Sequence, residues 1–590
     1  MLGDLLTEHH GRIDVATTIS HINPIVQTGN LHVAIYEVAQ KKIYLAHSAG
    51  SSEAGTGAPL LAFERPYMAI DAAQLLEEAR PSREASREAA PPQPCESGFD
   101  IRGECVPPGV SPLDWYVNHV VDDKYGWTGP VQTFGVDGGG TAYVLNLTSQ
   151  GWLANSDFKE TSLAKDVWTH QLIVVVPAKI VRAEGWLWIT GGDNDDTGPV
   201  SPVAADDGEV ATAAALSAAT GSVCSVLKQV PNQPVQFRVD LPHPDNMYPD
   251  EERTEDGIIA YTWNHLAVQD PTRPEWAARL PMTKSASKAM DAIGEFVSKL
   301  RPEAPKVDKF VVGGASKRGW TTWTTGLVDE RCIALVPVVM DFLAVRNNTV
   351  NAFESLGGYT FEFADYIAAG LLDSSLMYTE GYTKLMNLVD PHQYFRADRP
   401  AWDETPALRN FRAIPKLVVD GCNDEFMLPD DNHAWWDDLE GEKHLLHIAN
   451  ADHPLAWWPP GSGNGPAVFE ASLLAFYSAV VFSKKRPTFT WQLSEDGLII
   501  TAGNFSERPT ALTQWESTTS NGQRDWRLFD CRTGPGNNCT HFEANPAPDA
   551  PPGCQDRSPL PSPPLYLPSI VLPSSSAALG SLARIPFLMK

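Results

Sequence analysis

Between residues 111 and 485 the chain alternates short apolar segments with longer segments whose apolar residues recur at helical spacing. The apolar segments predict β-strands at 169–176, 185–190, 235–239, 309–312, 333–340, 416–419 and 443–448. Helices are predicted between them, including 210–220 and 283–300. Strands that alternate with helices form a mostly parallel sheet covered on both faces. The sequence therefore predicts an α/β domain with a doubly wound sheet, whose functional residues lie at the carboxyl ends of the strands.

One segment interrupts this alternation. Residues 342–410 are rich in aromatic and acidic side chains and lie between two predicted strands. An insertion of this length between strands is typical of a lid over a functional site. We therefore predict a helical lid inside a domain that spans residues 111–485.

The two ends of the chain differ from this domain. Residues 1–83 contain strand candidates at 31–36 and 42–46 but no functional motif, and the Pro-rich residues 84–110 are typical of a linker. After Pro487, two apolar segments around a turn predict a β-hairpin, so we expect a small β domain at 487–530. Residues 531–590 are dominated by Pro, Ser and Gly, which predicts disorder.

The net charge of the chain limits the classes of partner that it can bind. The 590 residues include 73 acidic and 45 basic side chains, which gives a formal net charge of −28. Because binding to a phosphate backbone requires a basic surface, this balance argues against a nucleic-acid partner. The sequence has no run of about 18 apolar residues, so no membrane-spanning helix is predicted.

Two features favour a secreted protein. The chain has eight cysteines, several of them in Pro- and Gly-rich segments, where disulfides stabilise chain with little core of its own. Asn-x-Ser/Thr triplets, which are acceptors for N-glycosylation, begin at Asn146, Asn347, Asn504 and Asn538. The first residues lack the basic start and apolar stretch of a signal peptide. The prediction of a secreted, disulfide-bonded glycoprotein therefore depends on the cysteines and the triplets.

The strongest local signal is the segment 310–320, FVVGGASKRGW. An apolar strand there leads into Ser316, and a helix-compatible stretch follows. A nucleophilic serine on a tight strand-to-helix turn needs a small residue two positions before it, and Gly314 meets that need. The common pattern is GxSxG, whereas here Arg318 occupies the second glycine position and Gly319 comes one residue later. A serine that only caps a helix would give a similar segment, so catalysis needs partner residues.

Two later strand ends supply such partners in the order serine, acid, histidine. Asp424 follows one predicted strand and His453 follows the next. Imidazole accepts the proton of a serine hydroxyl near neutral pH, and a carboxylate fixes its tautomer and stabilises the imidazolium. We therefore predict an α/β-hydrolase fold with Ser316, Asp424 and His453 as its catalytic triad. Alternative acids near the same strand ends are Asp341, Asp420 and Glu425.

An oxyanion hole is also expected, because the tetrahedral intermediate of acyl transfer carries negative charge that donors must stabilise. The backbone N–H of Lys317, directly after the serine, is one predicted donor. The second is expected from a loop after an early strand, where Gly191 or Gly192 allows close approach of the backbone.

Three further residues are candidates for substrate binding. Arg318 either contacts a carboxylate or carbonyl of the substrate or pairs with an acid under the lid. Trp457 and Trp458 follow His453 closely and are candidates to line the pocket, although tryptophan more often packs in a core. The chain has no phosphate-binding loop, no HExxH helix and no GxGxxG after a strand, so neither a metal nor another cofactor is predicted.

Many of these segments together resemble the PhoPQ-activated pathogenicity-related protein family, which includes autocrine proliferation repressor proteins. The resemblance covers about residues 111–530, through 112–117, 125–127, 188–192, 253–263, 278–283, 313–320, 424–426, 450–454 and 487–491. It implies an α/β-hydrolase-like domain followed by a β domain, and export from the cell. It also places the serine of its SKRG turn at Ser316, and its Asp-Glu-Phe and His-Pro segments at Asp424 and His453.

Two functions are consistent with the sequence. The first is a serine hydrolase that acts on an ester or amide of a small molecule or peptide through an acyl-enzyme intermediate. The alternative is a secreted signalling or binding protein that keeps the hydrolase scaffold and binds a partner such as a cell-surface receptor. A hydrogen bond between Ser316 Oγ and His453, directly or through one water, favours the first.

Overall fold

The computed structural model describes most of residues 95–509. Within that range the exceptions are 196–197, 200–201, 205, 240, 242–251, 357, 360, 401, 456–464 and 494–498. Residues 512–517, 524 and 526 are also described, as are the strands at 32–37, 42–47, 68–71, 567–571 and 583–586. The chain divides into two compact units, residues 1–93 and 94–590. In the first unit, β1 (His32–Glu37), β2 (Lys42–His47) and β3 (Met68–Asp71) form an antiparallel sheet, and two of them coincide with the predicted strands.

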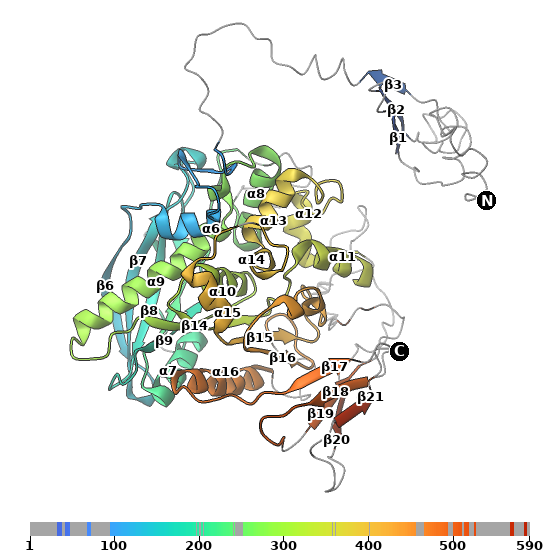
Figure 1. Ribbon diagram of the computed structural model, residues 1–590. Coiled ribbons are helices and arrows are strands. Elements are labelled where there is room, and N and C mark those ends of the chain that lie inside the picture. The colour runs from blue at the N-terminus through green and yellow to red at the C-terminus, as the bar shows by residue number, and fades with distance from the viewer. Residues whose placement is uncertain are drawn as a thin grey trace, which may run out of the picture. The chain divides into compact units, whose positions relative to one another are not determined.

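The second unit contains a nine-stranded sheet in the order β16-β15-β14-β13-β9-β12-β8-β7-β6 (Figure 1). Its strands are β6 (Gly126–Gly135), β7 (Thr141–Gly151), β8 (Val167–Val176), β9 (Glu184–Ile189), β12 (Cys224–Leu227), β13 (Lys309–Ala315), β14 (Cys332–Val338), β15 (Lys416–Gly421) and β16 (Lys443–Ile448). The strands from β16 to β12 in this order run parallel, and β8, β7 and β6 continue the sheet in antiparallel pairs. The predicted α/β domain with a mostly parallel sheet is confirmed.

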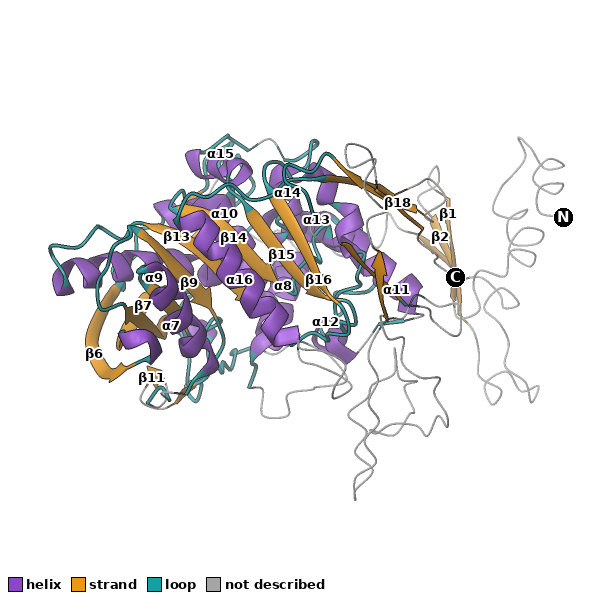
Figure 2. Cartoon of the chain, turned by 90° about the horizontal axis from the view of Figure 1, so that it is seen from below, coloured by secondary structure: helices purple, strands orange, loops and turns teal. Residues whose placement is uncertain are grey.

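Helices cover both faces of this sheet. Helices α7 (Gly208–Thr220) and α16 (Gly465–Val481) pack on one face, as Figure 2 shows. Helices α8 (Glu255–Asn264), α9 (Arg279–Leu300), α10 (Lys317–Val328) and α15 (Pro406–Ala413) contribute to the core on the other face. Since both faces are covered, β8 (VWTHQLIVVV) is buried over most of its length instead of alternating between core and solvent.

Local signals set the ends of these helices. At the start of α7, the Asp207 side chain accepts hydrogen bonds from the N–H groups of Glu209 and Val210. The same helix ends at Gly221, whose φ of 69° is the left-handed conformation that glycine adopts without strain. In α15, the Thr405 side chain caps the helix and Pro406 occupies its first turn, where a missing N–H costs nothing.

The observed strands differ from the predicted ones in two ways. In the nine-stranded sheet, β6, β7 and β12 were not predicted. The prediction of a strand at 235–239 is wrong. Val235 and Phe237 form only isolated bridges, although both side chains are buried. This segment follows Pro231 and Pro234, which cannot donate to a sheet ladder, so apolar burial there occurs without a strand.

The segment predicted as a lid is mainly helical where the structure describes it. It contains α11 (Val345–Leu356), α12 (Ala364–Ala368), α13 (Glu380–Val389), α14 (His392–Phe395) and α15. Near the C-terminus, β17 (Thr490–Leu493) and β18 (Ile499–Gly503) pair antiparallel, as the hairpin pattern predicts. They continue to β21 (Ala583–Pro586), while β19 (Leu512–Glu516) pairs with β20 (Leu567–Val571). Strands β20 and β21 lie in the tail for which the sequence predicts disorder.

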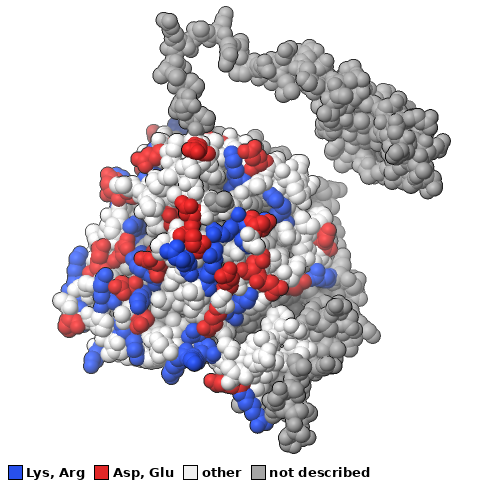
Figure 3. Space-filling model, in the orientation of Figure 1, with Lys and Arg blue, Asp and Glu red and all other residues white. Residues whose placement is uncertain are grey.

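Five of the eight cysteines lie in the described part of the chain. Cys95 and Cys105 form a disulfide, whereas Cys224, Cys332 and Cys422 are buried thiols. The other three cysteines, Cys531, Cys539 and Cys554, lie outside the described residues. Acidic and basic side chains are interspersed on the face shown in Figure 3. None of the helices in the described part of the chain combines the length and apolar character needed to cross a bilayer.

Close packing at the centre of the sheet generates a first prediction. A Cβ added at Gly313 in β13 would lie 2.6 Å from the buried Trp186 ring. Because a packed core resists insertion of even one methyl group, we expect Gly313→Ala to lower the free energy of unfolding by about 1–3 kcal/mol. Gly135→Ala in β6 is the matched control, since nothing lies within 4 Å of its added Cβ. Equal denaturation midpoints for the two variants would contradict the packing described for β13.

Candidate active site

Ser316 lies on a strained turn between β13 and α10. Its φ of 56° and ψ of −127° are outside the regions that non-glycine residues favour. Its N–H donates to the carbonyl of Val338 at 2.8 Å, and its carbonyl accepts from the N–H of Trp320 at 3.0 Å. A strand-to-helix turn of this kind at the carboxyl end of a parallel strand is the nucleophile elbow of α/β-hydrolases.

Two glycines make room for this turn. A Cβ at Gly314 would lie 2.7 Å from the carbonyl oxygen of Arg318. A Cβ at Gly319 would lie 2.7 Å from Met340 Cβ and 2.9 Å from the carbonyl oxygen of Val338. The second small position of the turn is therefore Gly319, which explains why the sequence departs from GxSxG and carries a large side chain at Arg318.

Arg318 pairs with an acid in the structure. Its Nη2 donates to Glu255 Oε1 at 2.5 Å, and its Nε donates to the carbonyl of Val230 at 2.6 Å. The guanidinium lies against Gly191, where any Cβ would collide with it. Of the two roles predicted for Arg318, these contacts match pairing with an acid, and they give Gly191 a packing reason to be glycine.

Asp424 and His453 form a hydrogen-bonded pair. Asp424 Oδ2 lies 2.8 Å from His453 Nδ1, and Asp424 Oδ1 accepts from the N–H groups of Phe426 and Met427 at 2.7 and 3.0 Å. The carboxylate is buried and fixed from both sides, which orients the imidazole. Glu425, one of the alternative acids, instead accepts the backbone N–H of His453 at 2.9 Å.

The charges around His453 favour its protonated form. Burial alone would lower the pKa of His453, but the Asp424 carboxylate and its hydrogen bond outweigh burial and hold this pKa above its ordinary value of 6.5. Lys317 opposes this effect and Glu425 adds to it. Glu362, from the segment predicted as the lid, also interacts electrostatically with His453, and burial raises the pKa of Glu362 to about 7.

Ser316 and His453 are not hydrogen-bonded to each other in this structure. His453 Nε2 is buried and has no hydrogen-bond partner among the described residues, Ser316 Oγ included. The Phe426 ring centroid lies 4.8 Å from that of His453, and Phe426 also lines the cavity that Ser316 lines. Catalytic hydrogen bonds are often long without substrate and tighten in the complex, so this separation is compatible with catalysis.

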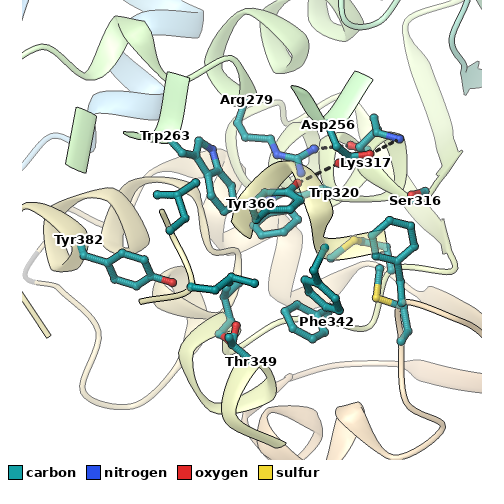
Figure 4. Close-up of a pocket in the computed structure, with 17 residues that line it drawn as sticks. Asp256, Trp263, Arg279, Ser316, Lys317, Trp320, Phe342, Thr349, Tyr366 and Tyr382 are labelled. Atoms are coloured by element: carbon teal, nitrogen blue, oxygen red, sulfur yellow. Dashed lines mark hydrogen bonds and ion pairs between the residues drawn. The ribbon is translucent and has the colours of Figure 1, made fainter. Parts of the chain in front are cut away.

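A cavity of about 60 Å³ lies beside Ser316 (Figure 4). Its walls are mainly aromatic and aliphatic, and the segment predicted as the lid supplies many of them. Lining residues from that segment are Phe342, Val345, Thr349, Phe363, Tyr366, Leu371, Leu372 and Tyr382. Trp263 and Trp320, from the helices under this segment, complete the apolar surface. Such a cavity accommodates a small apolar group next to the serine.

A charge network borders this cavity and was not predicted. Lys317 Nζ lies 2.8 Å from Asp256 and 3.0 Å from Glu255, at the start of α8. Asp256 also accepts a hydrogen bond from Tyr366 at 2.8 Å, and the Arg279 guanidinium donates to the Lys317 carbonyl at 2.7 Å. The network therefore ties the serine turn to α8, α9 and α12. No local motif reveals these partners, because each contact joins residues far apart in the sequence.

The structure describes the predicted oxyanion donors but not the two tryptophans predicted to line the pocket. The Lys317 N–H is at the first position of α10, where a helix leaves N–H groups without an intrahelical partner. Gly191 and Gly192 follow β9, the strand that neighbours β13, and Gly192 has a φ of 125°. Trp457 and Trp458 lie outside the described residues.

A second serine–histidine pair occurs in the core. Ser149 Oγ lies 2.9 Å from His170 Nε2, and His170 Nδ1 lies 3.0 Å from the carbonyl oxygen of Lys228. Both side chains are fully buried, and burial lowers the pKa of His170 to about 4. Neither residue lines the cavity beside Ser316. This pair lacks a carboxylate at Nδ1, so its hydrogen bonds fit a packing role better than a catalytic one.

The strand order and the turn at Ser316 define a protein of the α/β-hydrolase class. Residues 113–527 match the model of the PhoPQ-activated pathogenicity-related protein family. The chain is also 33% identical to "Autocrine proliferation repressor protein A" of Dictyostelium discoideum over 437 residues, which cover 71% of this chain and 77% of that protein. The chain belongs to the PhoPQ-activated pathogenicity-related protein family, as its sequence segments predict.

Solved esterase structures share a coarse likeness with this chain. Acetyl xylan esterase 1 from Thermoanaerobacterium sp. JW/SL YS485 is 16% identical, with a TM-score of 0.36, over 63% of this chain and 95% of that one. A glucuronoyl esterase from Solibacter usitatus is 13% identical, with a TM-score of 0.30, over 62% and 90%. At these scores the likeness adds nothing to the fold assignment, which depends on the strand order and the elbow.

The ion pairs of Glu255 give a second prediction. Burial alone would raise the pKa of Glu255, but Arg318 and Lys317 outweigh burial and lower it from 4.5 to about 2. A depressed pKa contributes stability above the unfolded value, and this contribution is lost as the pH falls from about 4.5 towards 2. We expect Glu255→Gln to lower the free energy of unfolding by about 1–3 kcal/mol at pH 7, allowing for partial exposure.

The pH dependence of that difference tests the cause. Urea denaturation between pH 7 and pH 3 should show the gap between wild type and Glu255→Gln narrowing as the pH falls. Glu303→Gln, at an exposed position, is the control and should match the wild type throughout. A gap that stayed constant with pH would mean that packing, and not the ion pairs, explains the loss.

Proposed function

We propose that this protein is a serine hydrolase that cleaves an ester or amide through an acyl-enzyme intermediate. The observation that carries the proposal is the strained turn that presents Ser316 beside an apolar cavity. Ser316 Oγ attacks the carbonyl carbon of the substrate, and His453 Nε2 accepts the hydroxyl proton. His453 then donates this proton to the leaving group, and water releases the acyl group by the same route.

The pair formed by Asp424 and His453 supports this role. Asp424 holds Nδ1, so the imidazole is oriented with Nε2 available to the serine. A substrate acyl group that enters the cavity displaces the Phe426 side chain from its place beside His453 and Ser316. We infer that Ser316 and His453 come into hydrogen-bond contact in this complex, where water is excluded.

The remaining parts of the mechanism follow from backbone positions. The N–H of Lys317 is proposed as one oxyanion donor, and an N–H at Gly191 or Gly192 as the other. Lys317 and Arg318 use their side chains to hold the turn in place. The small apolar cavity favours a short, uncharged acyl group on the substrate, with the leaving group towards solvent.

A second candidate function is signalling or binding on a hydrolase scaffold. Two observations favour it: the relative from Dictyostelium discoideum is named as a proliferation repressor, and no hydrogen bond joins Ser316 to His453 in this structure. In either case we propose that the protein is secreted. The exposed asparagines of the triplets at 146, 347 and 504, and the Cys95–Cys105 disulfide, support that location.

Labelling with a fluorophosphonate probe tests the leading proposal. The probe reacts covalently with activated serines, so we expect the folded wild type to be labelled and Ser316→Ala to lose at least about 100-fold of the labelling rate. Ser149→Ala removes the serine of the buried pair and is the matched control that should remain labelled. Circular dichroism confirms that each variant is folded. Absence of labelling in folded wild type would favour the binding function, and labelling lost only in Ser149→Ala would overturn the assignment to Ser316.

The pH profile tests the role of Asp424. His453 must be neutral to accept a proton, so a pKa above 6.5 places the midpoint of the acid limb of activity above pH 6.5. Asp424→Asn removes the main cause that raises this pKa, so we expect the midpoint to move to lower pH. The rate should also fall by about 100- to 10,000-fold, because the tautomer is no longer fixed. The labelling rate of Ser316 as a function of pH measures both effects.

The control for this experiment is Asp437→Asn, at an exposed position away from the pair. It should keep both the midpoint and the rate of the wild type. A midpoint that did not move in Asp424→Asn would mean that another carboxylate, such as Glu425, sets the charge of His453.

A further inference from the structure

A second cluster of polar side chains lies at the ends of three neighbouring strands. Asp341 follows β14, Asp420 lies in β15, and His447 lies in β16. Asp420 and His447 are register partners, so their side chains project to the same face of the sheet. One potential ligand atom from each of the three residues lies within 4.8 Å of the others.

Both carboxylates of this cluster are buried without a side-chain donor or a cation beside them among the described residues. Asp341 is 0% exposed and Asp420 is 1% exposed. In the described part of the chain, no side-chain donor pairs with their four carboxylate oxygens, and the N–H groups that act on them are backbone ones, of Asn432 on Asp341 and of Met340 on Asp420. Burial of an uncompensated carboxylate costs several kcal/mol. A bound cation or shared protons must therefore offset this charge.

A neighbouring carboxylate shows how donors satisfy a buried acid in this region. Asp431 is also fully buried, but its Oδ2 accepts from the N–H of Leu428 at 2.9 Å and its Oδ1 accepts from the Asn351 amide at 3.2 Å. Asp341 and Asp420 have no side-chain donor among the described residues and share their site with the His447 imidazole, whose Nε2 lies 3.4 Å from the Asn432 amide nitrogen. A nitrogen ligand together with free carboxylate oxygens is typical of metal coordination.

We propose that Asp341, Asp420 and His447 bind a divalent transition-metal ion, for which Zn²⁺ is the best fit. Two carboxylate oxygens and one imidazole nitrogen suit Zn²⁺ or Mn²⁺, whereas Ca²⁺ and Mg²⁺ prefer sites built from oxygen alone. Ligands about 2.1 Å from a tetrahedral ion lie about 3.4 Å from each other. The ligand atoms lie within 4.8 Å of one another, so binding of the ion draws them together by up to about 1.4 Å.

The ion has a structural role in this proposal. None of its three ligands lines the cavity beside Ser316. It joins the ends of β14, β15 and β16, and the last two of these strands lead into Asp424 and His453. The ion therefore stabilises the edge of the sheet whose strands lead into Asp424 and His453, the proposed acid and base. The proposal does not depend on hydrolysis, because the same strand ends need the same charge balance in a binding protein.

Metal binding by the purified full-length chain tests this site. The protein is dialysed against EDTA, freed of chelator and titrated with Zn²⁺, and in parallel with Mn²⁺, by calorimetry. We expect about one ion per chain, bound at least about 100-fold more weakly in Asp420→Asn and in His447→Gln. Matched controls are Asp390→Asn, which alters another buried carboxyl, and His444→Gln on the same strand, whose imidazole binds Glu442 at the surface. Both should bind zinc as the wild type does.

Two outcomes overturn the proposal. The first is a wild type that binds neither ion, above all if Asp420→Asn then raises the melting temperature of the metal-free chain, as shared protons would predict. The second is equal binding by the wild type and both ligand variants, which would place the ion elsewhere. Ser316→Ala should bind zinc normally, so failure of the hydrolase proposal and failure of the metal site are distinguishable. The wild-type titration needs no variant. It can therefore refute the proposal even if a variant of a ligand residue does not fold.

Discussion

The turn between β13 and α10 is the constraint on which the rest of the site depends. Ser316 has a backbone conformation that costs of order 1–3 kcal/mol, so the surrounding structure must hold it there. Gly314 and Gly319 let the strand, the turn and the helix approach within contact distance. The hydrogen bond from the Ser316 N–H to Val338 fixes the turn to the neighbouring strand. Any residue with a Cβ at either glycine would push the turn out of this geometry.

Charge supplies the second part of this support. Lys317 and Arg318 directly follow the serine, and both bind the acids at the start of α8. One of these acids, Asp256, accepts a hydrogen bond from Tyr366 of α12, so the turn and the segment over the cavity share one network. This arrangement explains why a large cation, Arg318, occupies the position where the GxSxG pattern has its second glycine. Lys317 and Arg318 act on the backbone of the turn through their partners, while the serine hydroxyl remains free to face the cavity.

The sequence predicted the parts of this site that are local. Strand runs at 309–312, 416–419 and 443–448 placed Ser316, Asp424 and His453 at the ends of parallel strands, because a strand and the residue after it are neighbours in sequence. Strand β12 was missed because its four residues, CSVL, are too short to show a period. The roles of Glu255 and Asp256, and the cluster of Asp341, Asp420 and His447, were missed because their partners come from other elements. Tertiary contacts between distant segments leave no spacing that a single sequence can reveal.

The carboxylates at this edge of the sheet show why Asp424, among several acids, pairs with the histidine. Asp424 lies in a turn whose N–H groups hold one oxygen and leave the other directed at Nδ1. Asp341 and Asp420 form no hydrogen bond with His453, and Glu425 meets only its backbone. Strain of this kind clusters at functional sites, so the backbone conformation of Ser316 supports the proposal that this serine is catalytic.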